Sequence, residues 1–162
     1  MPPPLLFDVD SIDTSTVQYN REAIYQRMPY AGEFQLLDGV FFVDRKEGLA
    51  AAYHDCLTDA WWTRGHIPGR PIFPGVLQME AAGQLVAFMS VYVEGNDNFV
   101  AFGGVENCRF REVVTPPARL LLVAKLTEQR PRRVKGDVQG LVDGTMVFHV
   151  RVTGLRLPAS SK

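Results

Sequence analysis

The sequence predicts an α+β domain in which a curved antiparallel sheet wraps around one long central helix. One segment, residues 76–93, is long and apolar enough for a helix that is buried on most sides. Strand-like segments lie on both sides of it, and the hairpin signal Asp143-Gly144 joins the last two. A helix that is apolar nearly all round needs a covering surface, which a curved sheet provides.

Composition agrees with a single globular domain. The chain has 162 residues, a net charge of −1, 46% hydrophobic and 22% charged residues. Abundant aromatic residues and the low net charge exclude intrinsic disorder, and the lack of basic excess disfavours a general nucleic-acid binder. Polar residues interrupt the longest apolar stretch, so no membrane span is expected. We expect an extension over residues 1–19, one domain over 20–158 and a tail over 159–162.

The N-terminus does not resemble a secretory signal. Its Pro-rich start has no positive charge, and the apolar residues 5–7 are too few for a signal core. We therefore expect a cytoplasmic protein whose two cysteines, Cys56 and Cys108, are reduced and structural. Two cysteines are too few for a disulfide framework, and no metal site is indicated.

The first half of the domain contains a short helix and two strands. Asn20 can cap a helix over residues 21–28, which Pro29 stops. Residues 36–44 and 49–57 are rich in apolar and β-branched side chains, so they predict two strands joined by a tight turn.

The second half follows an irregular stretch, residues 58–75. The helix over residues 76–93 comes next, and polar residues 94–98 break it. The remaining segments alternate or are rich in Val and Leu, which predicts further strands. These are residues 99–105, 108–111, 119–128, 134–142 and 146–153.

The chemistry concentrates in residues 65–84. Three prolines fix the backbone of the loop before the helix, which suits it to hold His66 in one place. An imidazole, with an ordinary pKa of about 6.5, suits proton transfer near neutral pH. Gly75, followed by Val76, opens the helix, where free N–H groups carry partial positive charge and can polarise a carbonyl.

Two polar residues lie on one face of this helix. Glu80 is in its second turn, and Gln84 follows four residues later. Burial disfavours an ionised carboxyl, so a carboxyl on an apolar helix suits the role of general acid. Each feature alone is ordinary: a loop histidine is most often structural, and a helix glutamate is most often solvated. Their combination at this spacing favours an acid/base pair.

The segment reads G-H-x-P-G-R-P-x-x-P-G-V-L-x-x-E-A-x-x-Q, and it resembles the bacterial hydroxyacyl-[acyl carrier protein] dehydratases, which have the hotdog fold. The resemblance continues over residues 104–110 and 141–144 and covers roughly residues 27–157. It implies reversible dehydration of (3R)-hydroxyacyl thioesters to trans-2-enoyl thioesters, with acyl carrier protein as the partner and no cofactor.

The resemblance also implies a role for each matching residue. His66 would remove a proton from C2, and Glu80 would protonate the departing C3 hydroxyl. The two would meet across a homodimer interface, with the dimer alone or in a trimer of dimers. Gly75, with Val76 beside it, would hold the thioester carbonyl, and Gln84 would contact the substrate. Glu80, where the isomerase subfamily has Asp, implies the plain dehydratase.

Three features differ from the family pattern or lie outside the motif. Tyr30 stands where the family has His, which, with the long N-terminal extension, indicates a divergent or specialised member. Trp61 and Trp62 replace a frequent Phe-Phe pair and either line an acyl tunnel or pack the loop. The basic run Arg130, Arg132, Arg133 and Lys135 either docks an acidic carrier protein or is a solvated hairpin end. An acyl thioesterase and a non-catalytic acyl-carrier-binding protein remain the alternatives.

Overall fold

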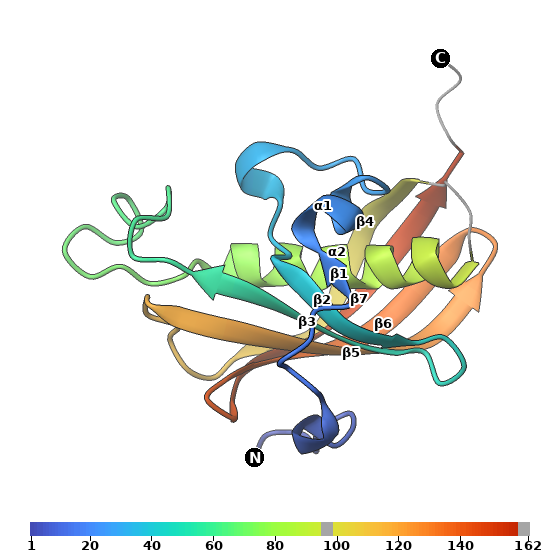
Figure 1. Ribbon diagram of the computed structural model, residues 1–162, viewed down its shortest axis with the longest axis horizontal. Coiled ribbons are helices and arrows are strands. Elements are labelled where there is room, and N and C mark those ends of the chain that lie inside the picture. The colour runs from blue at the N-terminus through green and yellow to red at the C-terminus, as the bar shows by residue number, and fades with distance from the viewer. Residues whose placement is uncertain (95–98, 159–162) are drawn as a thin grey trace.

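In the described part of the chain, seven antiparallel strands form one sheet that curves around a single long helix, α2 (Figure 1). The computed structural model describes residues 1–94 and 99–158. The strand order is β1-β2-β3-β5-β6-β7-β4, so the strand that follows α2 lies at one edge of the sheet. The predicted α+β class and its wrapped helix are confirmed.

The elements follow one another as short N-terminal pieces, two strands, the helix and four long strands. The short pieces are η1 (Val9–Ser11), β1 (Tyr19–Asn20), α1 (Arg21–Tyr25) and η2 (Gly32–Phe34). The main elements are β2 (Gly39–Asp44), β3 (Leu49–Cys56), α2 (Gly75–Glu94), β4 (Phe99–Phe110), β5 (Ala118–Arg130), β6 (Arg133–Val142) and β7 (Thr145–Leu157).

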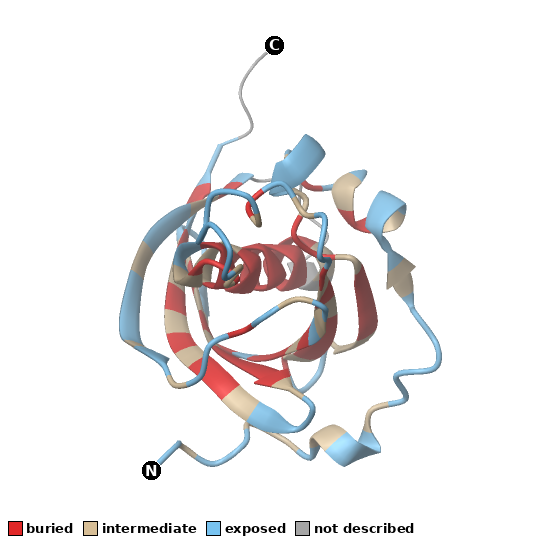
Figure 2. Cartoon of the chain, turned by 90° about the vertical axis from the view of Figure 1, so that its left-hand side faces the viewer, coloured by how far each residue is buried: buried red, intermediate tan, exposed pale blue. Residues whose placement is uncertain are grey.

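Helix α2 is buried along most of its length, as its apolar sequence predicts (Figure 2). Residues 81–91 are all buried. The sheet can approach closely because β6 has glycine beneath the helix: a Cβ on Gly136 would lie 2.8 Å from a methyl of Val86. The core therefore lies between α2 and the concave face of the sheet.

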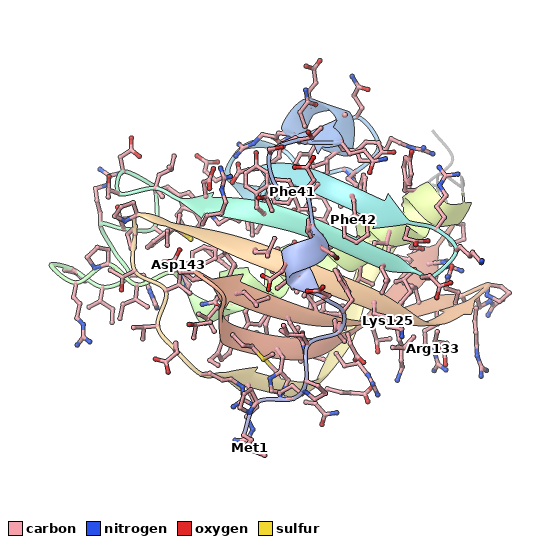
Figure 3. The ribbon with its side chains drawn as sticks, turned by 60° about the horizontal axis from the view of Figure 1, so that its bottom comes forward. Met1, Phe41, Phe42, Lys125, Arg133 and Asp143 are labelled. Carbon is pink, nitrogen blue, oxygen red and sulfur yellow. The ribbon has the colours of Figure 1, made fainter. Side chains whose placement is uncertain are left out.

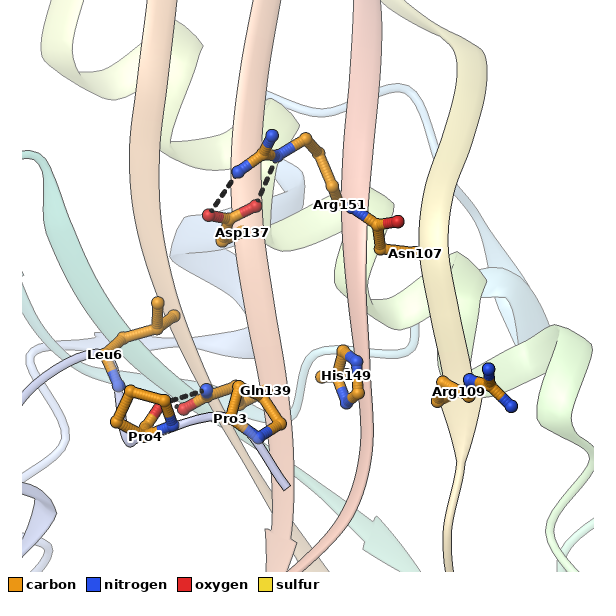
Figure 4. Close-up of a pocket in the computed structure, with 9 residues that line it drawn as sticks. All are labelled: Pro3, Pro4, Leu6, Asn107, Arg109, Asp137, Gln139, His149 and Arg151. Carbon is orange, nitrogen blue, oxygen red and sulfur yellow. Dashed lines mark hydrogen bonds and ion pairs between the residues drawn. The ribbon is translucent and has the colours of Figure 1, made fainter. Parts of the chain in front are cut away.

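The N-terminal segment crosses the convex face of the sheet (Figure 3). Leu6, Phe7, Val9 and Ile12 pack on a second apolar cluster, whose buried members are Ala51, Val123 and Leu141. The amide of Gln139 on β6 accepts from the Leu6 N–H (3.0 Å) and donates to the Pro4 carbonyl (2.8 Å; Figure 4). Residues 4–12 of the extension expected over residues 1–19 are therefore packed on the sheet, whereas residues 13–18 are exposed.

Several boundaries differ from those predicted. Asn20 caps α1 through the Ala23 N–H, as expected, but the helix ends at Tyr25 rather than residue 28. The strand predicted over residues 36–44 begins at Gly39, and residues 99–105 and 108–111 are one strand, β4, interrupted by bulges. The predicted break at residues 94–98 and the tail at 159–162 lie almost wholly outside the described residues.

The two edges of the sheet are very different. Strand β1 has only two residues, whereas β4 has twelve and, among residues 1–94 and 99–158, pairs only with β7. Apolar side chains are exposed along β4 and beside it: Val76, Phe99, Phe102, Val105 and Phe110. A long open edge with exposed apolar side chains favours pairing with another chain.

Candidate active site

The loop before α2 holds His66 by hydrogen bonds at both ends. The His66 N–H donates to the Trp62 carbonyl (2.8 Å), and the Ile72 N–H donates to the His66 carbonyl (2.9 Å). The Phe73 N–H donates to Val114 on the neighbouring segment (2.8 Å). The exposed imidazole is therefore carried by a fixed loop, although the loop has no regular secondary structure.

One ring nitrogen of His66 has a defined role. Nδ1 lies 2.8 Å from the Ile72 carbonyl oxygen, which can only accept a hydrogen bond. A neutral imidazole therefore carries its proton on Nδ1, and Nε2 keeps a free lone pair. That tautomer is the one that a general base needs.

The first turn of α2 offers free backbone donors beside the loop. Leu77 and Gln78 donate to the Pro74 carbonyl, whereas the N–H groups of Gly75 and Val76 have no partner in the part of the chain that the structure describes. A Cβ on Gly75 would lie 2.9 Å from the Phe110 ring, so glycine permits this packing. Val76 is 66% exposed.

Glu80 is half-buried on α2 and is held by Gln84. The Gln84 Nε2 donates to Glu80 Oε1 at 2.9 Å. Tyr30 is close enough to Glu80 to interact with it electrostatically. Burial first, and Glu80 second, raise the pKa of Tyr30 to about 12, so Tyr30 stays neutral near the carboxylate. The residue that departs from the family pattern thus lies within electrostatic range of the candidate acid.

The structure brings some predicted residues together and leaves others apart. Glu80 and Gln84 are in contact, but no hydrogen bond or ion pair joins His66 to Glu80 within the described chain. Gln84 is fully buried, and its amide contacts protein groups. Trp62 is buried against Phe73, whereas Trp61 is half-exposed.

Sequence reasoning missed Tyr25 and the carbonyl of Phe34. Both lie on the N-terminal side of the motif and contact Gln84. No spacing rule connects Tyr25 with a residue 59 positions later, because the contact exists only after α1 packs on α2. The Asn20 cap indicated α1 but not the direction of its last side chain.

The basic run lies at the far end of the molecule from the loop that carries His66 (Figures 1 and 3). Arg133 binds Glu128 through two hydrogen bonds, of 2.5 and 3.2 Å, and Lys135 binds Glu106 at 2.6 Å. Hydrogen bonding to Glu128 raises the pKa of Arg133. Arg130 also lies 3.6 Å from Glu128, so three cations of the run are paired with acids outside it.

Two further structural observations concern metals and membranes. Among residues 1–94 and 99–158, no three His, Cys, Asp or Glu side chains are grouped to hold a metal ion. No described helix has the length and apolarity that a membrane span requires.

The fold and the site together indicate a class of protein. A sheet wrapped around one helix, with a loop histidine before the helix and a carboxyl in its second turn, agrees with what the sequence resemblance to the hotdog-fold dehydratases implies. A model of the FabA-like domain family matches residues 28–151. The chain belongs to this family.

Two curated relatives carry the name 3-hydroxyacyl-[acyl-carrier-protein] dehydratase FabZ. The protein of Erythrobacter litoralis is 31% identical over 140 residues, which cover 85% of this chain and 92% of the relative. The protein of Exiguobacterium sibiricum is 32% identical over 136 residues, covering 83% and 96%. The chain is therefore a FabZ-like member, and these matches favour a dehydratase over the two alternatives.

A solved structure shows the same fold. The dehydratase heterocomplex ApeI:P from Xenorhabdus doucetiae matches with a TM-score of 0.72 at 15% identity, covering 83% of this chain and 91% of that one. At this identity the match is evidence for the fold alone, which is the hotdog fold.

Proposed function

We propose that this chain is a hydro-lyase that reversibly dehydrates (3R)-hydroxyacyl thioesters on acyl carrier protein, in fatty-acid or related lipid biosynthesis in the cytoplasm. The observation that carries the proposal is the hydrogen bond that sets the tautomer of His66, because it leaves Nε2 able to act as a base in the loop that precedes α2. The curated relatives are named for the same reaction.

The groups present are those that the elimination needs. His66 Nε2 takes the proton from C2, and the electrons of that C–H bond form the C2–C3 double bond. The C3–O bond breaks, and Glu80 supplies the proton that lets the hydroxyl leave as water. The negative charge that develops on the thioester oxygen is stabilised by the free N–H groups of Gly75 and Val76.

We propose that the working unit is a homodimer in which His66 of one chain meets Glu80 of the other. The open β4 edge and its exposed apolar side chains support a second copy of the chain at this edge. Glu80 lies close to that edge, since Gly83, three residues later on α2, contacts Phe102 of β4. Within the described chain no hydrogen bond or ion pair joins His66 to Glu80, which fits a shared site.

The two-fold symmetry of such a dimer supports docking of an acidic carrier protein at the basic run. The turn at Arg130–Arg133 lies at the Phe99 end of β4, whereas Gly75 packs against Phe110 at the other end. Antiparallel pairing of two β4 strands would reverse one chain relative to the other. The basic turn of each chain would then lie at the same end as its partner's catalytic loop.

Hydration of a crotonyl thioester, followed by loss of enoyl absorbance, tests the proposal. Wild type should hydrate it, and His66→Ala and Glu80→Gln should each lower kcat by about 10³-fold. His149→Gln is the matched control, because His149 lies on the convex face and should be dispensable.

Other outcomes would contradict the proposal. Release of free thiol without hydration would favour a thioesterase. A wild type inactive on enoyl and 3-hydroxyacyl thioesters, carried by coenzyme A or by acyl carrier protein, would favour a binding role. Turnover retained in His66→Ala would overturn the assignment of the base.

A further inference from the structure

Gln84 is surrounded by protein groups that determine the orientation of its amide. Its Oε1 accepts from the Tyr25 hydroxyl (2.6 Å) and from the Leu36 N–H (3.2 Å). Its Nε2 donates to the Phe34 carbonyl (2.7 Å) and to Glu80 Oε1 (2.9 Å). A primary amide has two acceptor and two donor positions, so this one is fully used.

This arrangement permits only one amide orientation. A backbone N–H can only donate and a backbone carbonyl can only accept, so Leu36 and Phe34 fix which end is oxygen. In a flipped amide, Nε2 would face the two hydrogen-bond donors, and Oε1 would face the two acceptors. Gln84 must therefore present an N–H to Glu80.

Tyr25 completes the network from outside the family motif. Its hydroxyl accepts from the Leu37 N–H (2.8 Å), so its single proton is directed at Gln84. Burial raises the pKa of this phenol, so it remains a donor across the usual assay range. Tyr25 is the last residue of α1 and precedes the region, residues 28–151, that matches the family model.

We propose that Tyr25 is a positioning residue that acts through Gln84 to determine which oxygen of Glu80 carries the catalytic proton. An N–H donor at Oε1 requires that oxygen to act as acceptor, so the proton of the neutral carboxyl is on Oε2. Oε2 is then the oxygen that protonates the leaving hydroxyl. This inference rests on the proposed dehydratase function.

The charged and titratable groups around this network are few. Tyr30 interacts electrostatically with Glu80, and Arg21, Asp38 and Tyr30 interact electrostatically with Tyr25. In the proposed dimer the partner's loop adds an imidazole. None of these groups is altered by a change at Tyr25 that removes only the hydroxyl.

The test is Tyr25→Phe in the dehydration direction, in which Glu80 is the acid: the gain of enoyl absorbance from a (3R)-hydroxybutyryl thioester is measured across pH. Loss of the hydroxyl leaves Gln84 Oε1 with one donor and loosens the amide. We expect kcat to fall roughly 10-fold while KM is unchanged, because the effect is on proton transfer rather than binding. When the Gln84 N–H is less firmly held, it stabilises the ionised form of Glu80 less. The alkaline limb of the pH profile of kcat should therefore move to higher pH by roughly half a unit.

Tyr92→Phe is the matched control. Tyr92 is on the same helix as Gln84, and its hydroxyl bonds to Tyr19, away from Glu80. This variant should keep wild-type kcat and the wild-type pH profile. A merely structural role for Tyr25 would lower the melting temperature of Tyr25→Phe without moving the alkaline limb.

A double-mutant cycle tests whether Tyr25 acts through Gln84. In a Gln84→Met background, Tyr25→Phe should have no further effect on kcat. Additive effects would overturn the inference, as would an unchanged pH profile for Tyr25→Phe. If Gln84→Met does not fold, the test rests on comparing the pH profile of kcat for Tyr25→Phe with that for Tyr92→Phe. A wild type without hydration activity would instead overturn the proposed function.

Discussion

At the residue scale, the start of α2 combines a backbone N–H donor with a side chain that packs closely against the same residue. The Gly75 N–H has no partner among the residues that the structure describes, and the ring of Phe110 lies over the position that a Cβ would occupy. Phe110 is at the exposed edge of the sheet, so its ring can swing outward if that position is filled. Glycine thus keeps both the donor and its surroundings in place.

Gly75→Ala should therefore reduce activity more than stability. The added methyl displaces Phe110 and narrows the approach to the N–H, so we expect kcat/KM to fall about 10- to 100-fold. Thermal unfolding should show a change of only a few degrees, since the helix start tolerates alanine. A variant with wild-type kcat/KM would show that Gly75 is not needed at the carbonyl.

Tyr30 is the residue at which the chain departs from the family pattern. It lies beside Tyr25, with ring centroids 6.3 Å apart, and interacts with Glu80. Because its pKa is raised to about 12, it is a neutral phenol where the family has an imidazole. The substitution thus changes a group at the candidate site itself.

At the element scale, Asp38 joins the segment before β2 to α1 and β3. Its carboxylate binds the Arg21 side chain, accepts from the Asp55 N–H (2.7 Å) and lies 3.2 Å from His54 Nδ1. Burial alone would raise the pKa of Asp38, but hydrogen bonds from His54, Asp55 and Arg21 outweigh it and lower the pKa below 3.8. The ionised carboxylate therefore stabilises the fold.

This lowered pKa predicts how stability depends on pH. The contribution of Asp38 is fully present above the unfolded-state pKa, near 3.8, and is lost as pH falls through the lower folded-state value. Asp38→Asn should cost about 2 kcal/mol at pH 7, with the difference from wild type shrinking below pH 3.8. Urea unfolding of both proteins at pH 7, 5 and 3 measures this difference in the free energy of unfolding.

The exposed Asp59 provides the control for that experiment. Asp59→Asn should change the free energy of unfolding by less than about 0.5 kcal/mol at every pH. A difference between Asp38→Asn and wild type that stays constant from pH 7 to pH 3 would show that the charge of Asp38 is not the cause.

At the scale of the whole molecule, β4 is the edge on which the proposed dimer depends. Val105→Lys places a charge on that edge, where Val105 is 42% exposed. A charge on an edge strand opposes pairing, so we expect a monomer by sedimentation and at least a 100-fold loss of activity. The loss follows because His66 and Glu80 would no longer meet.

Val17→Lys is the corresponding control at the opposite side of the sheet. Val17 is similarly exposed and lies next to Gly39 on β2, away from β4. This variant should keep the mass and activity of wild type. A Val105→Lys monomer with full activity would contradict the shared site.

The sequence by itself determined the fold class, the order of the main elements and the two candidate catalytic residues. Apolar and alternating patterns are local properties, and they indicated α2 and the long strands to within a few residues. The His66-to-Glu80 spacing is also local, because one loop and one helix carry both residues. The Asn20 cap was predictable for the same reason, since its bond reaches only Ala23.

Only the tertiary structure decided the contacts between distant segments. The Tyr25–Gln84 bond spans 59 positions, and the Leu6–Gln139 bond spans 133. Such contacts depend on how α1 and the N-terminal segment pack, and no sequence period encodes that packing. The open β4 edge likewise follows from strand order, which places the strand after α2 outermost although it lies mid-chain.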